Sequence, residues 1–236
     1  MTGPSSGPLA GARLSGARLS TALYDTIKTR LLEGKYAAGE RLVVESIRHE
    51  FGVSKQPVMD ALRRLSSEKL VVIMPQAGCE VVAYGPREVA DFYLLFGDFE
   101  GTIAAVAAQR RTLEQVEQLD LISARVDALI ASSNPAVRAH GYRIHNREFH
   151  GAIHAMAHSR ILEETSQRMW DMSDFLINTA GIANPLASVL PERQCDHRDI
   201  TEAIRDGAAE RARETMRDHI LKTIDVIDAE RNAESA

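Results

Sequence analysis

Apolar residues recur every three or four positions through most of the chain, a period typical of helices that bury one face. The period first appears over residues 21–34, and a short second helix is predicted over residues 44–50. It is clearest in the third stretch, residues 52–65, which reads as a turn followed by a helix. The apolar face of this third helix consists of Val58, Ala61, Leu62 and Leu65.

The pattern changes after the third helix. Residues 70–74 form a continuous apolar run, residues 75–78 carry turn-forming types, and residues 79–82 alternate as a second strand would. Three helices followed by a β-hairpin predict a winged helix-turn-helix, in which Gly78 would let the wing approach DNA closely.

Beyond a linker at residues 84–86, the helical period continues to the end of the chain. We therefore predict a mainly α protein, with an N-terminal winged helix-turn-helix and a C-terminal all-α antiparallel bundle. The expected bundle helices are residues 87–110, 113–132, 136–157, 160–180, 190–205 and 208–232. The expected domains are a flexible Gly/Ser/Pro/Ala-rich arm (1–20), the DNA-binding domain (21–83) and an effector-binding and dimerisation domain (87–232).

Charge is distributed unevenly between these parts. The whole chain has a formal net charge of -5. Residues 1–85 carry 11 Lys/Arg and 8 Asp/Glu, whereas residues 86–236 carry 17 Lys/Arg and 25 Asp/Glu. The N-terminal part is therefore the one suited to approach nucleic acid.

Other features of the composition favour a cytoplasmic protein without a membrane span. The 2 cysteines, Cys79 and Cys195, provide no disulfide framework. No apolar run approaches membrane-spanning length, and no signal-peptide pattern occurs.

The third helix carries the chemistry expected of a recognition helix. Ser54 is placed to cap its N-terminus, and long polar side chains occupy the face opposite the apolar stripe. Asp60 would repel phosphate, and we expect it to pair locally with Arg63 or Arg64. The candidate DNA-binding residues are Ser54, Lys55, Gln56, Met59, Arg63 and Gly78.

Residues 21–83 resemble the DNA-binding domain of the GntR family of bacterial transcriptional regulators. The family usually has Arg at the position of Lys55 and Arg-Glu at Met59-Asp60, so the resemblance implies an operator different from the common one. The motifs that carry it are Gly39-Glu40-Arg41-Leu42, Phe51-Gly52-Val53-Ser54-Lys55-Gln56-Pro57-Val58-Met59-Asp60-Ala61-Leu62 and Pro75-Gln76-Ala77-Gly78.

Histidines carry the candidate chemistry of the second half. Asn146 and His150 are four residues apart and share the inward face of one helix. His197 and His219 lie ten residues before and twelve after Gly207, so an antiparallel hairpin brings them level. Three imidazoles and an amide oxygen in one core would suit a divalent transition metal. A row formed by His150, His154 and His158 offers a rival ligand set, and single core histidines are more often only hydrogen-bonded.

Residues 87–230 resemble the C-terminal ligand-sensing domain of the FadR subfamily within the same family. That domain often binds a metal through an Asp-x-x-x-His helix and two later histidines, which here correspond to Asn146, His150, His197 and His219. Asn146 stands where the subfamily has Asp. The resemblance implies a metal such as Zn or Ni, and many relatives sense small carboxylates.

The effector site is less clearly marked. Phe96 occupies the position of the subfamily's usual Arg, four residues before Glu100, and aromatic residues suggest an apolar lining. Such residues are also ordinary core residues. The candidate effector-pocket residues are Tyr93, Phe96 and Trp170.

The sequence thus favours a homodimeric DNA-binding regulator that responds to a small-molecule effector and binds a double-stranded operator. The alternatives are a metal-dependent enzyme with a DNA-binding-like domain and a metal-stabilised dimerisation module. No carboxylate is placed by a motif as a general base, so no catalytic residue is predicted.

Overall fold

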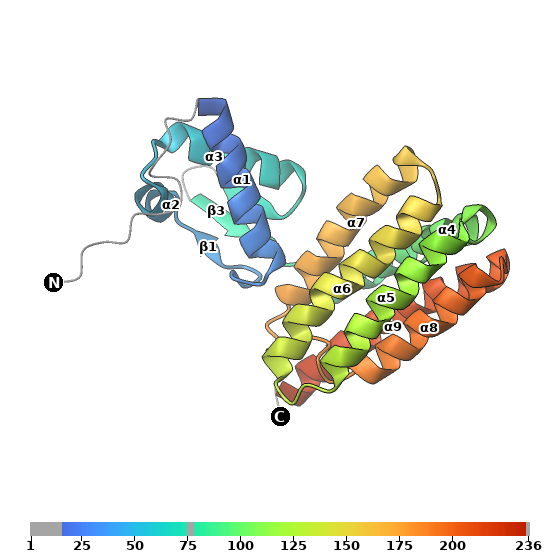
Figure 1. The fold of residues 1–236 in the computed structure, drawn as a ribbon. Coiled ribbons are helices and arrows are strands. Elements are labelled where there is room, and N and C mark those ends of the chain that lie inside the picture. The colour runs from blue at the N-terminus through green and yellow to red at the C-terminus, as the bar shows by residue number, and fades with distance from the viewer. Residues whose placement is uncertain (1–15, 75–77, 235–236) are drawn as a thin grey trace. The chain divides into compact units, whose positions relative to one another are not determined.

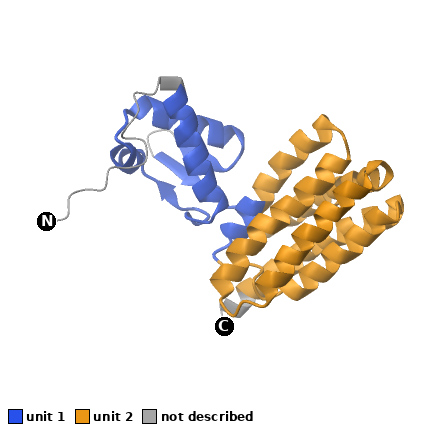
Figure 2. Cartoon of the chain, viewed as in Figure 1, with its two compact units in different colours: residues 1–84, 174–181 blue, residues 85–173, 182–236 orange. Residues whose placement is uncertain are grey.

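The computed structural model describes residues 16–74 and 78–234, and the chain divides into two units (Figures 1 and 2). The first unit contains the chain up to Tyr84 together with Asp174–Gly181, and the second contains Gly85–Ser173 and Ile182–Ala236. Of the predicted arm, residues 1–15 lie outside the described part. Residues 16–20 are helical rather than part of an arm, because the first helix begins at Gly16.

The first unit is a winged helix-turn-helix. Leu23, Ile27 and Leu31 of α1 are fully buried, as is the predicted apolar face of α3. The two helices pack on each other, and the predicted three-helix arrangement is confirmed. Its elements are α1 (Gly16–Leu32), β1 (Arg41–Leu42), α2 (Val44–Phe51), α3 (Lys55–Ser67), β2 (Val71–Met74) and β3 (Gly78–Val81).

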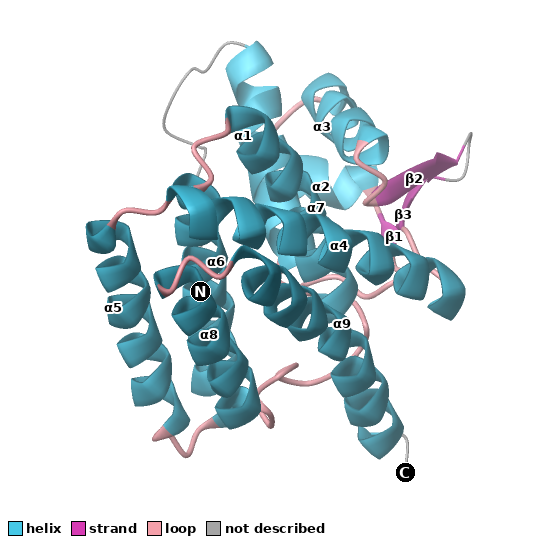
Figure 3. Cartoon of the chain, turned by 90° about the vertical axis from the view of Figure 1, so that its right-hand side faces the viewer, coloured by secondary structure: helices cyan, strands magenta, loops and turns pink. Residues whose placement is uncertain are grey.

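The wing contains a strand that was not predicted. β2 and β3 pair antiparallel as expected, and the two-residue β1 adds to the other edge of β3 (Figure 3). Cys79 of β3 lies opposite both Leu42 of β1 and Ile73 of β2. Two residues are too short to show a period of two, so only tertiary pairing reveals β1.

The turn into α3 depends on a glycine. Gly52 adopts the left-handed conformation, with φ 65°, and its N–H donates to the carbonyl oxygen of Arg48 at the end of α2. Ser54 occupies the N-cap position of α3 with an extended backbone, but its side chain makes no capping hydrogen bond. The expected hydroxyl cap is therefore wrong for this structure.

The second unit is a bundle of helices, as the sequence predicted. Within the described residues six helices begin after the wing: α4 (Pro86–Arg110), α5 (Leu113–Ile130), α6 (Pro135–Met156), α7 (Arg160–Asn178), α8 (Leu190–Arg205) and α9 (Ala209–Glu234). The C-terminal end of α7, from Asp174, clusters with the first unit instead of with this bundle.

The two longest helices of the bundle, α4 and α9, pack closely. A Cβ atom built on Gly101 of α4 would lie 2.8 Å from the carbonyl oxygen of Arg213 on α9, and one on Gly97 would lie 3.3 Å from that of Arg217. Side chains larger than hydrogen would push the helices apart at these points. In the described part of the chain, no helix combines the length and the apolar composition needed to span a membrane.

Candidate nucleic-acid interface and metal centre

The N-terminal end of α3 presents polar side chains to solvent. Ser54, Lys55 and Gln56 are all exposed, while the apolar residues of the same helix are buried. The apolar face of α3 is therefore packed against its own domain, while its polar N-terminal end is open to solvent. A recognition helix needs this arrangement.

Asp60 organises the polar face of α3. Its Oδ1 atom accepts a hydrogen bond from Gln56 Nε2 at 2.9 Å and another from Arg63 Nη1 at 2.8 Å. The predicted local ion pair of Asp60 thus forms with Arg63. Arg64 instead lies over the ring of Tyr24, with its guanidinium carbon 3.7 Å from the ring centroid.

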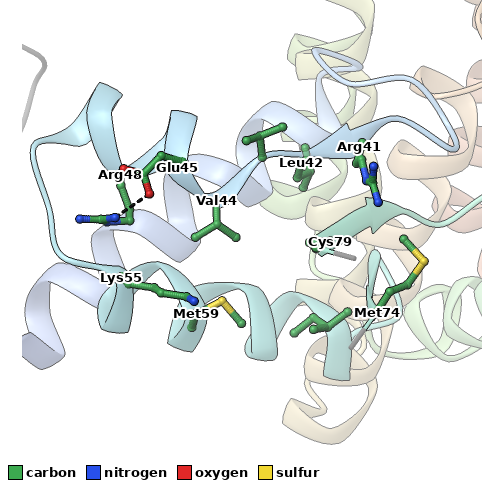
Figure 4. Close-up of a pocket in the computed structure, with 12 residues that line it drawn as sticks. Arg41, Leu42, Val44, Glu45, Arg48, Lys55, Met59, Met74 and Cys79 are labelled. Carbon is green, nitrogen blue, oxygen red and sulfur yellow. Dashed lines mark hydrogen bonds and ion pairs between the residues drawn. The ribbon is translucent and has the colours of Figure 1, made fainter. Parts of the chain in front are cut away.

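A groove of about 750 Å³ lies beside α3 in the first unit (Figure 4), and we call it the wing groove. Of the candidate DNA-binding residues, Lys55, Met59 and Gly78 line it. Sequence reasoning missed two arginines in the same lining, because they lie on other elements and only the tertiary fold brings them there. The wing groove is lined by Arg41, Leu42, Val43, Val44, Glu45, Arg48, Lys55, Met59, Ile73, Met74, Gly78 and Cys79.

In the second unit, His150 of α6, His197 of α8 and His219 of α9 converge. One ring nitrogen from each lies within 4.8 Å of the others, and all three side chains are buried. Among the described residues, they form the one cluster of three or more His, Cys, Asp or Glu side chains that could share a metal ion. The hairpin about Gly207 brings His197 and His219 level, with ring centroids 4.7 Å apart.

The rival row along α6 does not converge in this way. The Nε2 atom of His154 lies 2.9 Å from Oε2 of Glu100, and the other carboxylate oxygen, Oε1, accepts a hydrogen bond from Ser166 at 2.5 Å. His158 follows the end of α6 and is exposed, with φ 48°. His154 is therefore engaged in a buried hydrogen-bond network, and His158 points away from the cluster.

The donor atoms of the cluster fit a metal ion. Both ring nitrogens of His150 and of His197 are buried and have no hydrogen-bond partner among the residues that the structure describes, as is the case for Asn146 Oδ1 one turn before His150. Buried polar atoms normally have partners, so this concentration of unpartnered ones is compatible with a site that could hold a metal ion. Ligands held tetrahedrally at about 2.1 Å from one ion lie about 3.4 Å apart. The three ring nitrogens lie within 4.8 Å of one another, so they would have to approach by up to roughly 1.4 Å to share an ion.

Two carboxylates stand behind the histidines. Asp196 Oδ2 lies 3.2 Å from Nδ1 of His219, and Glu100 Oε2 lies 3.7 Å from Nδ1 of His150. Asp196 is close enough to fix the tautomer of His219 and to direct its Nε2 at a metal. The separation between Glu100 and His150 is too long for a hydrogen bond. Sequence reasoning did not find Asp196, because its role depends on the distance across two helices.

Arg193 is the group that the metal would have to displace. This buried arginine donates to the carbonyl oxygen of His219 at 2.7 Å, and its Nη2 lies 3.0 Å from Nε2 of the same histidine. Its Nε donates to the hydroxyl of Tyr142 at 3.2 Å. A metal bound to His219 Nε2 would therefore take one of three contacts of Arg193 and leave its guanidinium facing the ion.

Burial keeps the three imidazoles neutral. It lowers the pKa of His150 to about 4, against the opposing effect of Glu100, and it lowers the pKa values of His197 and His219 well below the ordinary range. The positive charge of Arg193 lowers all three further. Neutral imidazoles keep the lone pairs that a metal requires.

Of the predicted effector residues, Trp170 contacts the histidine cluster directly, and Phe96 contacts Trp170. Trp170 packs on His150 with ring centroids 4.3 Å apart and on Phe96 at 5.1 Å, and its buried Nε1 makes no hydrogen bond. The hydroxyl of Tyr93 lies 3.2 Å from that of Ser173. Phe96 is fully buried, so at present it is part of the core.

Comparison with known proteins identifies both units. Residues 19–81 match the bacterial regulatory proteins of the gntR family, and residues 92–222, more than half of the chain, match the FCD domain. The chain belongs to the GntR family and carries an FCD domain. A protein of this family is a transcriptional regulator that binds DNA, and this leaves the enzyme alternative without support.

Relatives of this GntR protein share its full architecture. It is 23% identical to the HTH-type transcriptional repressor GlaR of Escherichia coli over 206 residues, which cover 86% of this chain and 93% of the relative. It is 25% identical to the Uxu operon regulator of Haemophilus influenzae, covering 90% and 85% of the two chains.

Two solved structures show the same fold. E. coli McbR/YncC matches with a TM-score of 0.72 at 19% identity, over 89% of this chain and 97% of its own. A putative GntR regulator from Rhodococcus sp. RHA1 matches with a TM-score of 0.69 at 17% identity, over 90% and 98% of the two chains.

Proposed function

We propose that this GntR protein is a cytoplasmic, homodimeric regulator of the FadR subfamily whose operator affinity is controlled by a small carboxylate bound at the histidine cluster. Two copies of α3 would enter successive major grooves of the operator. Effector binding in the FCD domain would change the spacing of the two winged helices and lower operator affinity through a population shift.

The proposed DNA contacts are those of the exposed end of α3 and of the wing. Lys55 and Gln56 would reach base edges, Ser54 and Arg63 would contact the backbone, Met59 would make apolar contacts in the groove, and Gly78 would let the wing come close. The exposure of the first three residues supports this assignment.

The proposed metal is Zn or Ni, held by His150, His197 and His219, with Asn146 as an oxygen donor. When bound, the ion would supply a Lewis-acidic position for an oxygen ligand. The single observation that carries this proposal is the set of buried, unpartnered nitrogen and oxygen atoms on two neighbouring elements of the bundle.

The carboxylate effector follows from the charges. Arg193 has no carboxylate among its described contacts, and a metal at His219 would add a second positive charge beside it. A small anion that binds both would neutralise the pair, since buried charges require partners. Tyr93, Phe96 and Trp170 would then border the apolar part of the effector.

The test uses purified full-length protein and its own promoter fragment. We expect a gel shift that is reversed by one member of a panel of small mono- and dicarboxylates, and only in metal-loaded protein. The Lys55→Ala/Gln56→Ala double variant should lose operator-specific binding while its circular dichroism is unchanged. A double variant with wild-type affinity would reject the assignment of α3, and elemental analysis without metal in unchelated protein would reject the metal site.

A further inference from the structure

We propose that Arg48, on α2 and not on the recognition helix, is a further DNA-contacting residue that binds a backbone phosphate of the strand lying in the wing groove. This inference rests on the proposed function, because it assumes that α3 enters a major groove beside this strand. It adds a contact that no motif in the sequence indicates.

The backbone of Arg48 is fixed at the turn into α3. Its carbonyl oxygen accepts the N–H groups of Gly52 and of Val53, the latter at 3.1 Å. The position of Arg48 relative to the start of α3 is therefore set by the same hydrogen bonds that form the helix-turn-helix. A phosphate contact from this residue would fix the register of α3 in the groove.

The side chain of Arg48 lines the wing groove together with Lys55 (Figure 4). Arg41 of β1 lines it as well, and Glu45 is the one acidic residue in the lining. Three cations therefore face one anion in a concave surface between α3 and the wing. A sugar-phosphate backbone carries a row of negative charges, and the three cations of this surface would attract it.

Arg48 has hydrogen-bonding capacity left for this phosphate. Its Nη1 pairs with Glu45 at 2.5 Å, but the Glu45 side chain is 74% exposed, and exposed pairs of this kind contribute little. The Arg48 side chain is 34% exposed, so part of it is open to solvent. Its Nε atom is buried in the present side-chain conformation and has no hydrogen-bond partner in the described part of the chain, so a turn of the side chain towards a phosphate would give this atom a partner. A phosphate offers several acceptor oxygens to the planar guanidinium, which makes it the stronger partner.

The residues of α3 that line the wing groove offer few hydrogen-bond donors to a phosphate, so a guanidinium from Arg48 would add to them. Met59 lines the same groove without a charge, and Lys55 supplies a single point charge rather than a fork of donors. Arg48 would thus add a planar fork of donors to the part of the wing groove that Lys55 and Met59 line.

The test measures the salt dependence of binding to the operator and to an unrelated duplex. Arg48→Gln keeps much of the aliphatic stem and removes the charge. We expect it to weaken both complexes by a similar factor, about five- to tenfold, and to reduce the slope of log K against log salt by about 0.9. Glu45→Gln, which releases Arg48, should strengthen both complexes.

Lys35→Gln is the matched control, because it removes one positive charge from an exposed residue of the same unit that does not line the groove. It should leave the salt slope at the wild-type value. An unchanged slope in Arg48→Gln, or an equal fall in Lys35→Gln, would overturn the proposal.

The test of Arg48 can fail while the test of the proposed function succeeds. If Lys55→Ala/Gln56→Ala loses operator specificity while Arg48→Gln behaves as wild type, α3 is the recognition helix and Arg48 is not a contact. Thermal unfolding of every variant identifies a loss of fold, and Arg48→Lys, which keeps the charge, should retain the wild-type salt slope.

Discussion

Nδ1 of His219 lies 3.2 Å from Oδ2 of Asp196, across the interface between α9 and α8. If Nδ1 carries the proton, Nε2 is the acceptor for Arg193 Nη2, 3.0 Å away, and would offer the same lone pair to a metal that displaces this contact. The same carboxylate accepts a hydrogen bond from Lys222 at 2.6 Å through its other oxygen, which holds it in place. In the proposed metal site, this arrangement would make Asp196 the main support of His219 as a ligand.

Asp196→Asn should lower zinc affinity by about 10- to 100-fold, because the amide no longer favours the tautomer that presents Nε2. Competition titration with a chromogenic chelator measures the change. Asp199→Asn, an exposed position on the same helix, is the control and should bind zinc as wild type does. Equal affinities in all three proteins would show that Asp196 does not support a ligand.

Asn146→Asp should raise zinc affinity by at least about tenfold, since a carboxylate oxygen binds a divalent cation better than an amide oxygen does. The unpartnered, buried Oδ1 of Asn146 is the atom that gains the charge. The same variant should be less stable than wild type when metal is removed, because it buries an unpaired charge. Isothermal titration and urea unfolding measure the two effects, and a variant with weaker zinc binding would exclude residue 146 as a ligand.

Asp60→Ala should increase binding to unrelated DNA by about three- to tenfold and reduce discrimination in favour of the operator. The substitution removes a negative charge from the side of α3 that is proposed to face DNA, and it releases Gln56 and Arg63 from their shared partner. Fluorescence anisotropy with operator and scrambled duplexes measures both quantities. Asp25→Ala, on the exposed side of α1, controls for charge alone. Weaker binding to the scrambled duplex would contradict the assigned role of Asp60.

The metal-free protein should lose stability on acidification. Burial lowers the folded-state pKa of His150 to about 4, whereas the unfolded chain takes up that proton near about pH 6.5. The free energy of unfolding is therefore highest above about pH 6.5, where His150 is neutral in both the folded and the unfolded state. It decreases as pH falls towards about 4, because only the unfolded chain takes up the proton. His150 alone should account for about 2 kcal/mol of unfolding free energy between about pH 7.5 and pH 5.

Urea unfolding of chelated protein at these two pH values measures this loss. His150→Gln should reduce the difference between the two pH values, since glutamine does not titrate. A His150→Gln protein with the full wild-type pH dependence would show that this imidazole is not the group responsible.

Several features followed from the sequence because they depend on local chemistry. The apolar period of residues 52–65 predicted the helix and its buried face, and Gly52 marked the turn before it. The separation of His197 and His219 from Gly207 predicted their approach, because the rise of a helix fixes which residues of a hairpin lie level. The six bundle helices were found within a few residues of their observed ends.

Other features were decided by tertiary structure alone. The strand β1 has two residues, and only its pairing with β3 makes it a strand. The hydroxyl of Ser54 suits a helix cap by type, but the side chain does not make that bond here. Arg48, Asp196 and Arg193 are ordinary polar residues in the sequence, and their roles depend on which side chains the packing places within a few ångströms.

The sequence by itself therefore determined the helices, the family and the set of histidines. Each of these depends on the order and spacing of residues within one short segment of the chain. The fold decided which of those histidines meet, and which charged groups stand behind them. These are distances between segments far apart in the chain, and they are set by how buried apolar faces fit together.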